Sequence, residues 1–339
     1  MKKFSLPKDG GLIEAGLPKG ILHSFERIPA NIFEDEEIAC ADLADEIINA
    51  INGSFGVFRL GLTTGTSPVY LYRELVRRHK AGDVSFKNVE IFSIDEYYPA
   101  PAPSQSRNKR LIEELINHID VKPENVHIPR HTEVRDTVTE ANADFDRLAK
   151  GLDLLVLGVG EKGQVGFNEA GSTEKSRTRT VLLSYNSRKR QAKNFGGDVD
   201  ATPRTAITMG ISTMLSAKKI VLIAWGEDKA GIVKKVVEDK VNPECPASYL
   251  QRHENISFYV DENSASLLTR NVAPWLVGPC EWTPKFVRKA VVWLSETVHK
   301  PILKLTQGDY LSNGLGELLE KIDSYDQINI KVFNDLQHT

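Results

Sequence analysis

The sequence GVFRLGLTTGTSPVYLYRELVRRH, residues 56–79, decides the fold class of this chain. Residues 56–62 form a largely apolar run of strand length, and residues 63–67 are threonine, glycine and serine. The remainder has helical periodicity, with Pro68 at the expected first turn, where a missing backbone N–H costs nothing. Strand, polar loop and helix in this order predict a βαβ unit.

Three further apolar runs, residues 89–94, 153–158 and 220–225, have similar lengths. Helical patterns lie between and around the runs, at residues 36–51, 68–79, 108–118, 139–148, 206–215 and 229–237. The alternation predicts an α/β fold, a three-layer αβα sandwich with a mostly parallel, Rossmann-like sheet, plus a C-terminal extension. Ligands bind at the carboxyl ends of the strands of such a sheet, so we expect the site residues directly after the runs.

The composition excludes several classes of protein. The 339 residues are 41% apolar and 26% charged, as in soluble globular proteins, and 43 Lys plus Arg against 46 Asp plus Glu give a net charge of −3. No basic field therefore favours nucleic acid or an anionic membrane. Cys40, Cys245 and Cys280 form no disulfide framework or zinc ribbon, and no segment has the length of a membrane span or the pattern of a signal peptide. We expect a cytoplasmic protein.

A loop of small polar residues follows the first run and precedes a helix. Backbone N–H groups at a helix N-terminus bind anions without a charged side chain, so a phosphate or sugar-phosphate site fits. The loop matches neither a Walker loop nor a G-x-G-x-x-G fingerprint, so a nucleotide is not indicated. An ordinary tight turn explains the loop equally well. Its residues are Thr63, Thr64, Gly65, Thr66 and Ser67.

Carboxylates follow the next two runs. Asp95 and Glu96 are adjacent at the end of a strand, so at most one of them faces a shared pocket. Asp95 could take a proton from carbon, although a solvated loop pair explains the same residues. Residues 158–172, GVGEKGQVGFNEAGS, have four glycines in the first nine positions, which allows the backbone to approach a ligand closely. Glu169 in this segment is a candidate acid or base.

Two groups of cations complete the pattern. Lys229 follows the fourth run, where it could pair with a phosphate, although an exposed lysine at a helix start explains it too. Residues 188–193 are basic and precede Gly196 and Gly197, which suits a flap that closes over an anion. A solvated helix face is the alternative. No aromatic residues interleave with the basic cluster, so nucleic acid explains it poorly.

Together these segments resemble the glucosamine-6-phosphate deaminase/isomerase family, whose fold is shared with the 6-phosphogluconolactonases. The likeness extends over roughly residues 26–270, and Phe167-Asn168-Glu169 is similar to the deaminase branch. The matching segments are residues 60–68, 84–89, 95–97, 158–160, 166–169, 176–179, 206–210 and Lys229.

The resemblance implies conversion of glucosamine 6-phosphate to fructose 6-phosphate and ammonia, without a cofactor. It implies that the Thr64–Ser67 loop, Lys229 and a flap cation hold the phosphate. That cation is an arginine in the family, and Lys193 is nearest to it here. Asp95 matches the carboxylate that moves a proton between C2 and C1 of the open-chain amino sugar. Glu169 matches the carboxylate that assists ring opening through a histidine. A homo-oligomer is compatible with the resemblance.

Lys162 and Gln164 depart from the family, whose loop carries Asp and His at these positions. Glutamine does not titrate near pH 7, so Gln164 cannot relay a proton as histidine does. Three alternatives follow: a deaminase slowed at ring opening, an enzyme for a related sugar phosphate with Lys162 as a new acid or anion contact, or a sugar-phosphate-binding protein that does not catalyse. A 6-phosphogluconolactonase-like hydrolase is a fourth alternative.

Regulation by an effector is also expected to differ from that in the family. Ser172 and Arg179 match part of a site for an effector phosphate at a subunit interface, but Val181 stands where the family has lysine. We therefore expect weak or absent activation by an N-acetylated sugar phosphate.

The organisation predicted for the chain is a lead over residues 1–25, a deaminase-like domain over residues 26–272 and an extension over residues 273–339. The extension contains three of the four tryptophans and is short for a core of its own. It resembles the connecting segment of longer bacterial relatives, in which a deacetylase-like half follows. We expect it to dock on the domain or to link to a missing domain. We expect no metal site, because the closely spaced His and Asp residues of a metal-dependent deacetylase are not seen in the sequence.

Overall fold

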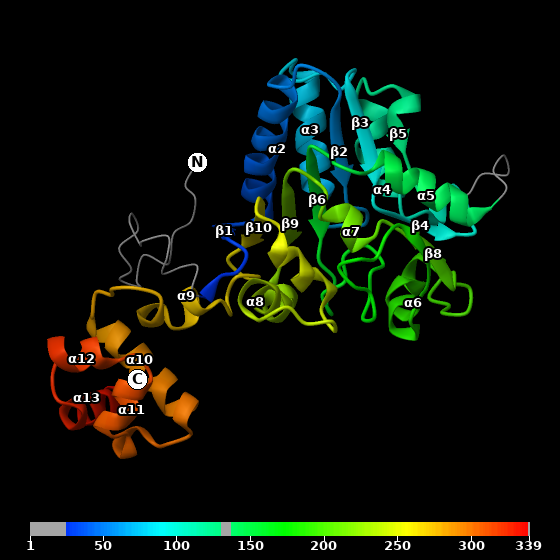
Figure 1. Ribbon diagram of the computed structural model, residues 1–339. Coiled ribbons are helices and arrows are strands. Elements are labelled where there is room, and N and C mark those ends of the chain that lie inside the picture. Colours follow the sequence, from blue (N-terminus) through cyan, green and yellow to red (C-terminus); the bar gives the residue numbers. More distant parts are fainter. Residues whose placement is uncertain (1–24, 130–136, 338–339) are drawn as a thin grey trace. The chain divides into compact units, whose positions relative to one another are not determined.

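The computed structural model describes residues 25–129 and 137–337 (Figure 1). These residues divide into two compact units. Unit 1 contains the described residues from Arg27 to Ala265, and unit 2 contains residues 25–26 and the described residues from Ser266 onward. None of the helices in the described ranges has the length and apolar character that crossing a bilayer requires.

Unit 1 is built on a seven-stranded sheet with the order β1-β10-β9-β6-β2-β3-β5, in which every neighbouring pair is parallel. All four predicted runs form strands of this sheet, which confirms the fold class. The strands are β1 (Ala30–Phe33), β2 (Phe58–Leu62), β3 (Val89–Ser93), β5 (Val126–His127), β6 (Leu154–Gly158), β9 (Ile220–Ala224) and β10 (Ile256–Asp261).

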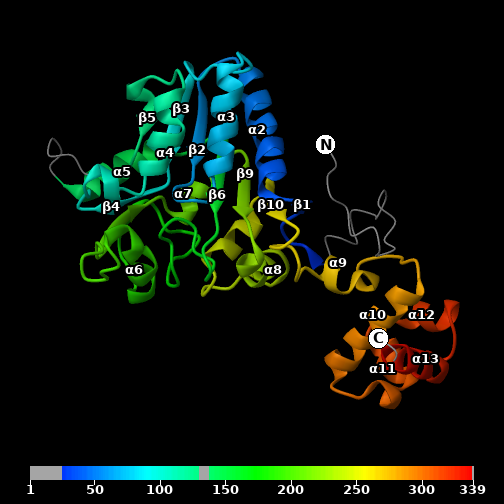
Figure 2. The same ribbon diagram turned by 180° about the vertical axis from the view of Figure 1, so that it is seen from behind.

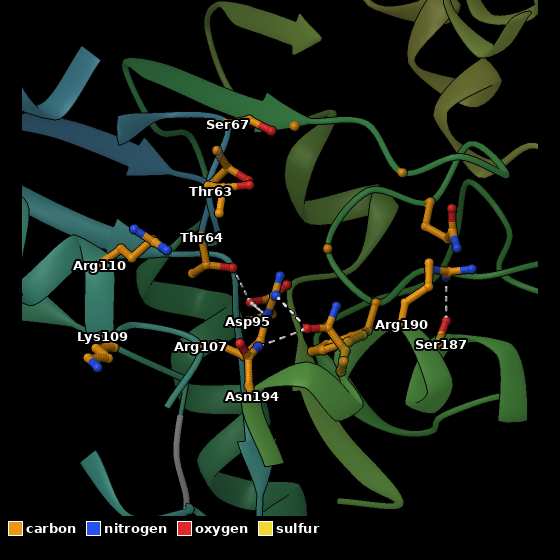
Figure 3. Close-up of a pocket in the computed structure, with 18 of the residues that line it drawn as sticks. Thr63, Thr64, Ser67, Asp95, Arg107, Lys109, Arg110, Ser187, Arg190 and Asn194 are labelled. Carbon is orange, nitrogen blue, oxygen red and sulfur yellow. Dashed lines mark hydrogen bonds and ion pairs between the residues drawn. The ribbon is translucent and has the colours of Figure 1, made fainter. Parts of the chain in front are cut away.

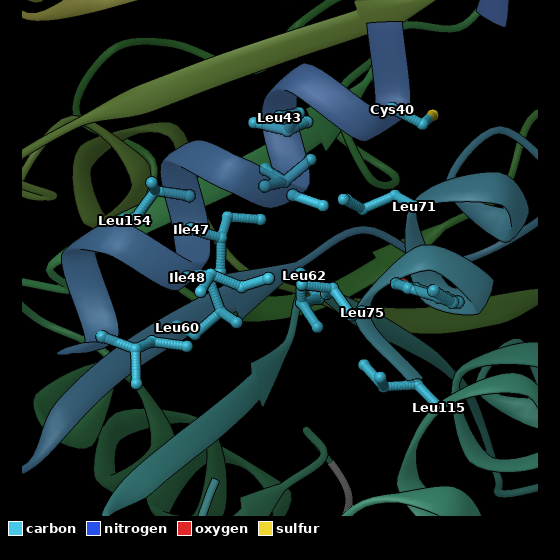
Figure 4. Close-up of a cluster of buried hydrophobic side chains, with 14 of the residues drawn as sticks. Cys40, Leu43, Ile47, Ile48, Leu60, Leu62, Leu71, Leu75, Leu115 and Leu154 are labelled. Atoms are coloured by element: carbon cyan, nitrogen blue, oxygen red, sulfur yellow. The ribbon is translucent and has the colours of Figure 1, made fainter. Parts of the chain in front are cut away.

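Helices flank the sheet, as the views from front and back show (Figures 1 and 2). Asp35 caps the first of them, α2, by accepting a hydrogen bond of 2.8 Å from the N–H of Ile38. Apolar residues at helical spacing in α2 and α3, such as Leu43, Ile47 and Leu75, pack against β2 in one buried cluster (Figure 4). The helices of unit 1 are α2 (Glu36–Asn52), α3 (Val69–Lys80), α4 (Lys109–Glu114), α5 (Val138–Leu148), α6 (Tyr185–Gln191), α7 (Ile211–Met214) and α8 (Ala230–Glu238).

A second, antiparallel sheet was not predicted. It consists of β4 (Asp95–Tyr98), β8 (Thr205–Thr208) and β7 (Arg179–Leu182), with β8 in the middle. The predicted helix over residues 206–215 was wrong in its first half, because β-branched residues there pair with two strands. The helix α7 begins only after Gly210. The small sheet matters for the site, since it contains Asp95 at its first position.

Unit 2 is helical, with α9 (Thr269–Val272), α10 (Pro284–Val298), α11 (Gln307–Ser312), α12 (Gly316–Lys321) and α13 (Tyr325–Gln337). Three tryptophans meet in its interior, with ring centroids of Trp275 and Trp282 6.2 Å apart and those of Trp275 and Trp293 5.2 Å apart. Buried residues of α10 to α13 surround them. The apolar side chains of this short segment therefore pack with one another. The predicted docking of the extension on the domain stays a prediction.

Candidate active site

A cavity of about 760 Å³ in unit 1 is formed at the carboxyl ends of the central strands. It is lined by the loops after β2, β6 and β9, by Asp95 and the segment that follows β4, and by α6 with the turn after it (Figure 3). The described lining residues are 63–67, 95, 104–107, 109, 110, 113, 158–161, 164, 166, 167, 169, 187, 190, 191, 193, 194 and 229.

Most of the predicted site residues meet in this cavity. Residues 63–67, Asp95, Gln164, Glu169, Lys193 and Lys229 line it. Lys162, Ser172 and Arg179 do not belong to the lining, so the structure does not bring them together with the others.

The loop of residues 63–67 is held in place through its carbonyl groups. The carbonyl of Thr63 accepts a hydrogen bond from the buried hydroxyl of Tyr72, and that of Ser67 accepts one of 2.9 Å from the indole N–H of Trp225. Gly65 has a φ of +93°, which a residue with a side chain rarely adopts. The loop lines the cavity and leads into the twelve-residue helix α3. A fixed loop at a helix N-terminus is suited to bind an anion.

Asp95 is fully buried, and its two carboxylate oxygens differ in their partners. Oδ1 accepts a hydrogen bond of 2.6 Å from the hydroxyl of Thr64 and lies 3.3 Å from Nε of Arg107 (Figure 3). Oδ2 is buried and has no hydrogen-bond partner. A Cβ at Gly166 would lie 3.5 Å from Oδ2, so this glycine leaves space beside the oxygen. Oδ2 is therefore the atom that remains available to take a proton.

The carboxylate of the neighbouring Glu96 is fully occupied by hydrogen bonds from nearby backbone and side-chain groups. Its Oε1 accepts hydrogen bonds of 2.8 Å from the N–H of Tyr97 and 3.0 Å from that of Arg107. Its Oε2 accepts hydrogen bonds from the side chains of Ser106 and Asn108. Glu96 is not among the residues that line the cavity, as expected from the alternation of side chains along a strand. This carboxylate fixes the turn that carries Arg107.

The glycine-rich loop after β6 places Glu169 and Gln164 at the cavity. Oε1 of Glu169 is buried without a hydrogen-bond partner. The side chain of Gln164 folds back on its own loop, where Oε1 accepts a hydrogen bond of 3.0 Å from the N–H of Lys162. Its amide nitrogen is therefore the end that can donate to a ligand. The side chain of Lys162 is exposed. No histidine appears among the described residues that line the cavity.

Cationic side chains reach the cavity from three segments. Lys193 and Lys229 were predicted as site residues, and Arg190 belongs to the basic cluster predicted to form a flap, whereas Arg107, Lys109 and Arg110 were not predicted. Arg190 lies on α6 and donates a hydrogen bond of 2.8 Å to the hydroxyl of Ser187. In Figure 3, Arg110 on α4 and Arg190 on α6 lie on opposite sides of Asp95. The only feature of the sequence that could have indicated residues 107–110 is that they follow Asp95 within the same segment of the chain.

Ser172 and Arg179 contact each other outside the cavity lining. Nη2 of Arg179 donates a hydrogen bond of 2.8 Å to the hydroxyl of Ser172, and Nη1 donates one of 3.0 Å to Oδ1 of Asn168. Burial lowers the pKa of the Arg179 guanidinium. Both partners are neutral groups, so a half-buried cation lies behind the loop that carries Glu169.

The described residues contain no cluster of three His, Cys, Asp or Glu side chains arranged to hold a metal ion. The cavity combines a loop at a helix N-terminus, several cations and four carboxylates, of which Asp95 and Glu169 each have a buried oxygen without a hydrogen-bond partner.

Comparisons with known proteins show which family this chain resembles. The model of the family "Glucosamine-6-phosphate isomerases/6-phosphogluconolactonase" matches residues 34–258. A putative glucosamine-6-phosphate deaminase-like protein of Bacteroides thetaiotaomicron is 42% identical over 335 residues, which cover 96% of this chain and 50% of the relative. This chain thus spans about half the length of that relative. Glucosamine-6-phosphate deaminase 2 of Bacillus subtilis is 40% identical over 212 residues, which cover 62% of this chain and 85% of the relative.

A solved structure is similar over the same region. The structure of a monomeric glucosamine-6-phosphate deaminase matches with a TM-score of 0.66 and 31% identity, and the match covers 71% of this chain and all of that one.

Proposed function

This chain belongs to the family of glucosamine-6-phosphate isomerases and 6-phosphogluconolactonases, and from that premise we propose that it converts glucosamine 6-phosphate and water to fructose 6-phosphate and ammonia. The observation that carries the proposal is the buried Asp95, whose Oδ2 has no hydrogen-bond partner at a cavity with an anion-binding loop. The relatives named as deaminases support the proposal. The role of each residue below is part of it.

The phosphate binds at the loop of residues 63–67. Backbone N–H groups at the start of α3 donate hydrogen bonds to its oxygens, and the helix dipole favours its negative charge. Lys229 and Lys193 line the same cavity and supply positive charge from two other segments. Three segments that contact one phosphate fix the sugar at one end, so that its C1 and C2 atoms are directed toward Asp95.

Asp95 moves one proton between two carbon atoms of the open-chain sugar. Oδ2 takes the proton from C2, the electrons of the C2–H bond form a C1–C2 double bond, and the carbonyl oxygen at C1 takes up a proton. Asp95 then returns its proton to C1, which leaves a protonated imine at C2. Water adds to C2, ammonia leaves, and the proton that O1 had taken up is released to solvent, so that a ketone remains. A base placed in this way contributes a rate factor on the order of 10²–10⁴.

Ring opening precedes these steps, and the site lacks a titratable group at position 164 to assist it. Glu169 lines the cavity with an unpartnered oxygen, but Gln164 of the same loop cannot carry a proton to or from the sugar ring. The exposed side chain of Lys162 is outside the lining and does not replace the missing acid there. We therefore propose that opening of the closed ring is slow in this protein.

Release of ammonia from glucosamine 6-phosphate tests the proposal. The unmutated protein should release ammonia, and Asp95→Asn should abolish the release while it still binds the substrate in a calorimeter. If the unmutated protein binds the sugar phosphate and releases nothing, it is a sugar-phosphate-binding protein. Hydrolysis of 6-phosphogluconolactone, measured in parallel, would instead indicate a lactonase.

The organisation of the whole protein remains a proposal. We propose a deaminase-like domain over residues 26–272, with residues 273–339 as an extension that docks on it or links to a further domain. We also propose a cytoplasmic setting, with no nucleic acid or membrane partner. A homo-oligomer is compatible with the proposal, and sedimentation of the full chain measures its oligomeric state.

A further inference from the structure

Arg107 is the residue at which four segments of the site meet. Its Nε lies 3.3 Å from Oδ1 of Asp95, and its guanidinium carbon lies 5.1 Å from the ring centroid of Phe167 in the glycine-rich loop. Nη1 donates a hydrogen bond of 3.4 Å to Gln191 at the end of α6 and lies 3.9 Å from an ideal Cβ position at Gly65 of the phosphate loop. The side chain of Arg107 therefore lies close to the candidate base, to the loop of residues 63–67, to α6 and to the glycine-rich loop after β6.

The guanidinium is fixed in this position. The side chain of Arg107 is 16% exposed, and its backbone N–H donates a hydrogen bond to the buried Glu96. Glu96 also accepts hydrogen bonds from Ser106 and Asn108, on either side of Arg107 in the chain. A cation held by its backbone and over an aromatic ring loses little conformational entropy when it pairs with a carboxylate.

Among the described residues, Arg107 is the cation that forms an ion pair with Asp95. In the described part of the chain, Tyr72 from α3 and Tyr97 from β4 are two further titratable groups on which the Asp95 carboxylate acts. Burial, with a contribution from Asp95, raises the pKa of Tyr72, and burial raises the pKa of Tyr97 to about 12. Both phenols therefore stay neutral at the pH values at which enzymes work. Although burial alone would lower it, the pKa of Arg107 is raised, chiefly by the Asp95 carboxylate.

We propose that Arg107 is a positioning residue for the base, an inference that rests on the proposed function. It places its positive charge beside Asp95 and occupies Oδ1 together with Thr64, so that Oδ2 is the oxygen of this carboxylate that is free to take the proton. Through Gln191 it also connects the base to the flap helix, so that the position of α6 and the orientation of Asp95 depend on each other.

The first experiment needs no turnover. Thermal unfolding of the full chain is measured for Arg107→Gln, Asp95→Asn and the double variant. Removing only the guanidinium leaves a buried carboxylate without its cation, which is more harmful than removing both charges. The melting temperature should therefore fall in Arg107→Gln and recover in the double variant. Arg147→Gln, at an exposed ion pair with Asp144, is the control and should melt like the unmutated protein. Additive losses in the double variant would overturn the charge pairing.

The second experiment measures ammonia release against pH. Without the guanidinium the protonated form of the buried carboxyl is favoured, so the acid limb of the profile in Arg107→Gln should move up by about 1–3 pH units. Arg107→Lys keeps the charge and should restore part of the shift. Gln191→Ala should raise KM and leave the acid limb in place. An unchanged acid limb in Arg107→Gln, with only KM raised, would mean that Arg107 merely binds substrate.

The two proposals fail in different ways. If the unmutated protein releases no ammonia, the proposed function fails, and the melting temperatures alone decide whether Arg107 and Asp95 act as a pair. If it releases ammonia and both the melting temperatures and the acid limb are insensitive to the guanidinium, the inference on Arg107 fails while the proposed function stands.

Discussion

Gly166→Ala should abolish activity through a single methyl group, because Gly166 borders the base. An ideal Cβ at this position lies 3.5 Å from Oδ2 of Asp95 and 2.7 Å from Oγ1 of Thr208. The substrate carbon that loses its proton must itself come to about 3–3.5 Å from Oδ2. The methyl group and that carbon thus compete for the same space. A misplacement of about 1 Å costs about 100-fold in rate, so kcat/KM should fall at least about 100-fold.

The substitution also strains the backbone, and that effect needs its own control. Gly166 has a φ of +57°, where a residue with a Cβ costs roughly 1–2 kcal/mol. For a unit of this size the melting temperature should fall by about 2–4 °C per kcal/mol. Gly171 lies in the same loop with a φ of +94°, and an added Cβ there meets nothing within 4 Å. Gly171→Ala therefore carries comparable backbone strain without the contact to Asp95.

The assay compares ammonia release and thermal unfolding for the two variants. Both should melt below the unmutated protein, and only Gly166→Ala should lose turnover. The contact of the new methyl group with Thr208 adds to the loss of stability, since Oγ1 of Thr208 accepts a hydrogen bond of 3.1 Å from the N–H of Phe167. If Gly171→Ala loses as much activity as Gly166→Ala, backbone strain explains the effect. If Gly166→Ala keeps full activity, Oδ2 of Asp95 does not face the reacting carbon.

Three further predictions concern the other parts of the site. Lys229→Ala should weaken binding of glucosamine 6-phosphate about 10-fold or more in a calorimeter, because it removes a positive charge that would contact the phosphate. The change leaves Asp95 in place, so kcat should change little, and a fall in kcat alone would contradict this role. The double change Lys162→Asp and Gln164→His should raise turnover on the closed-ring substrate, since it restores a titratable relay beside Glu169, whereas an equal or lower rate would show that ring opening is not limiting. N-acetylglucosamine 6-phosphate should activate ammonia release weakly or not at all, and Arg179→Gln should leave this result unchanged. If activation is strong and Arg179→Gln removes it, the guanidinium serves an effector site even though Val181 replaces the family's lysine.

The sequence predicted the residues of the site that directly follow strands. The loop of residues 63–67, Asp95, Glu169 and Lys229 each come after an apolar run, and parallel strands bring their carboxyl ends to one edge. The prediction therefore needed only the runs and the direction of the strands. Lys193 was located through its resemblance to a family position, because its segment belongs to no strand of the main sheet.

Arg107 could not be found in the same way. Its place depends on Glu96, which is outside the cavity lining and accepts hydrogen bonds from the backbone of Arg107 and the side chains of Ser106 and Asn108. It also depends on the small antiparallel sheet that β4 begins. Neither feature has a period that a single sequence displays. The mistaken helix over residues 206–215 has the same origin, because residues 205–208 become a strand only through pairing with β4 and β7.

The charge of the cavity bears on the proposal that a slightly acidic chain binds an anionic substrate. Six cationic side chains line it among the described residues, from Arg107, Lys109, Arg110, Arg190, Lys193 and Lys229, against the four carboxylates of Asp95, Glu113, Glu161 and Glu169. The difference of two positive charges is opposite in sign to the net charge of −3 of the whole chain. It also balances a phosphate, which carries about −1.5 to −2 near neutral pH. Because Arg107 already pairs with Asp95, the excess of positive charge comes from α4, from α6 with the turn after it, and from Lys229. A cavity with this balance suits one phosphate dianion, which is the charge that the substrate of the proposed function carries.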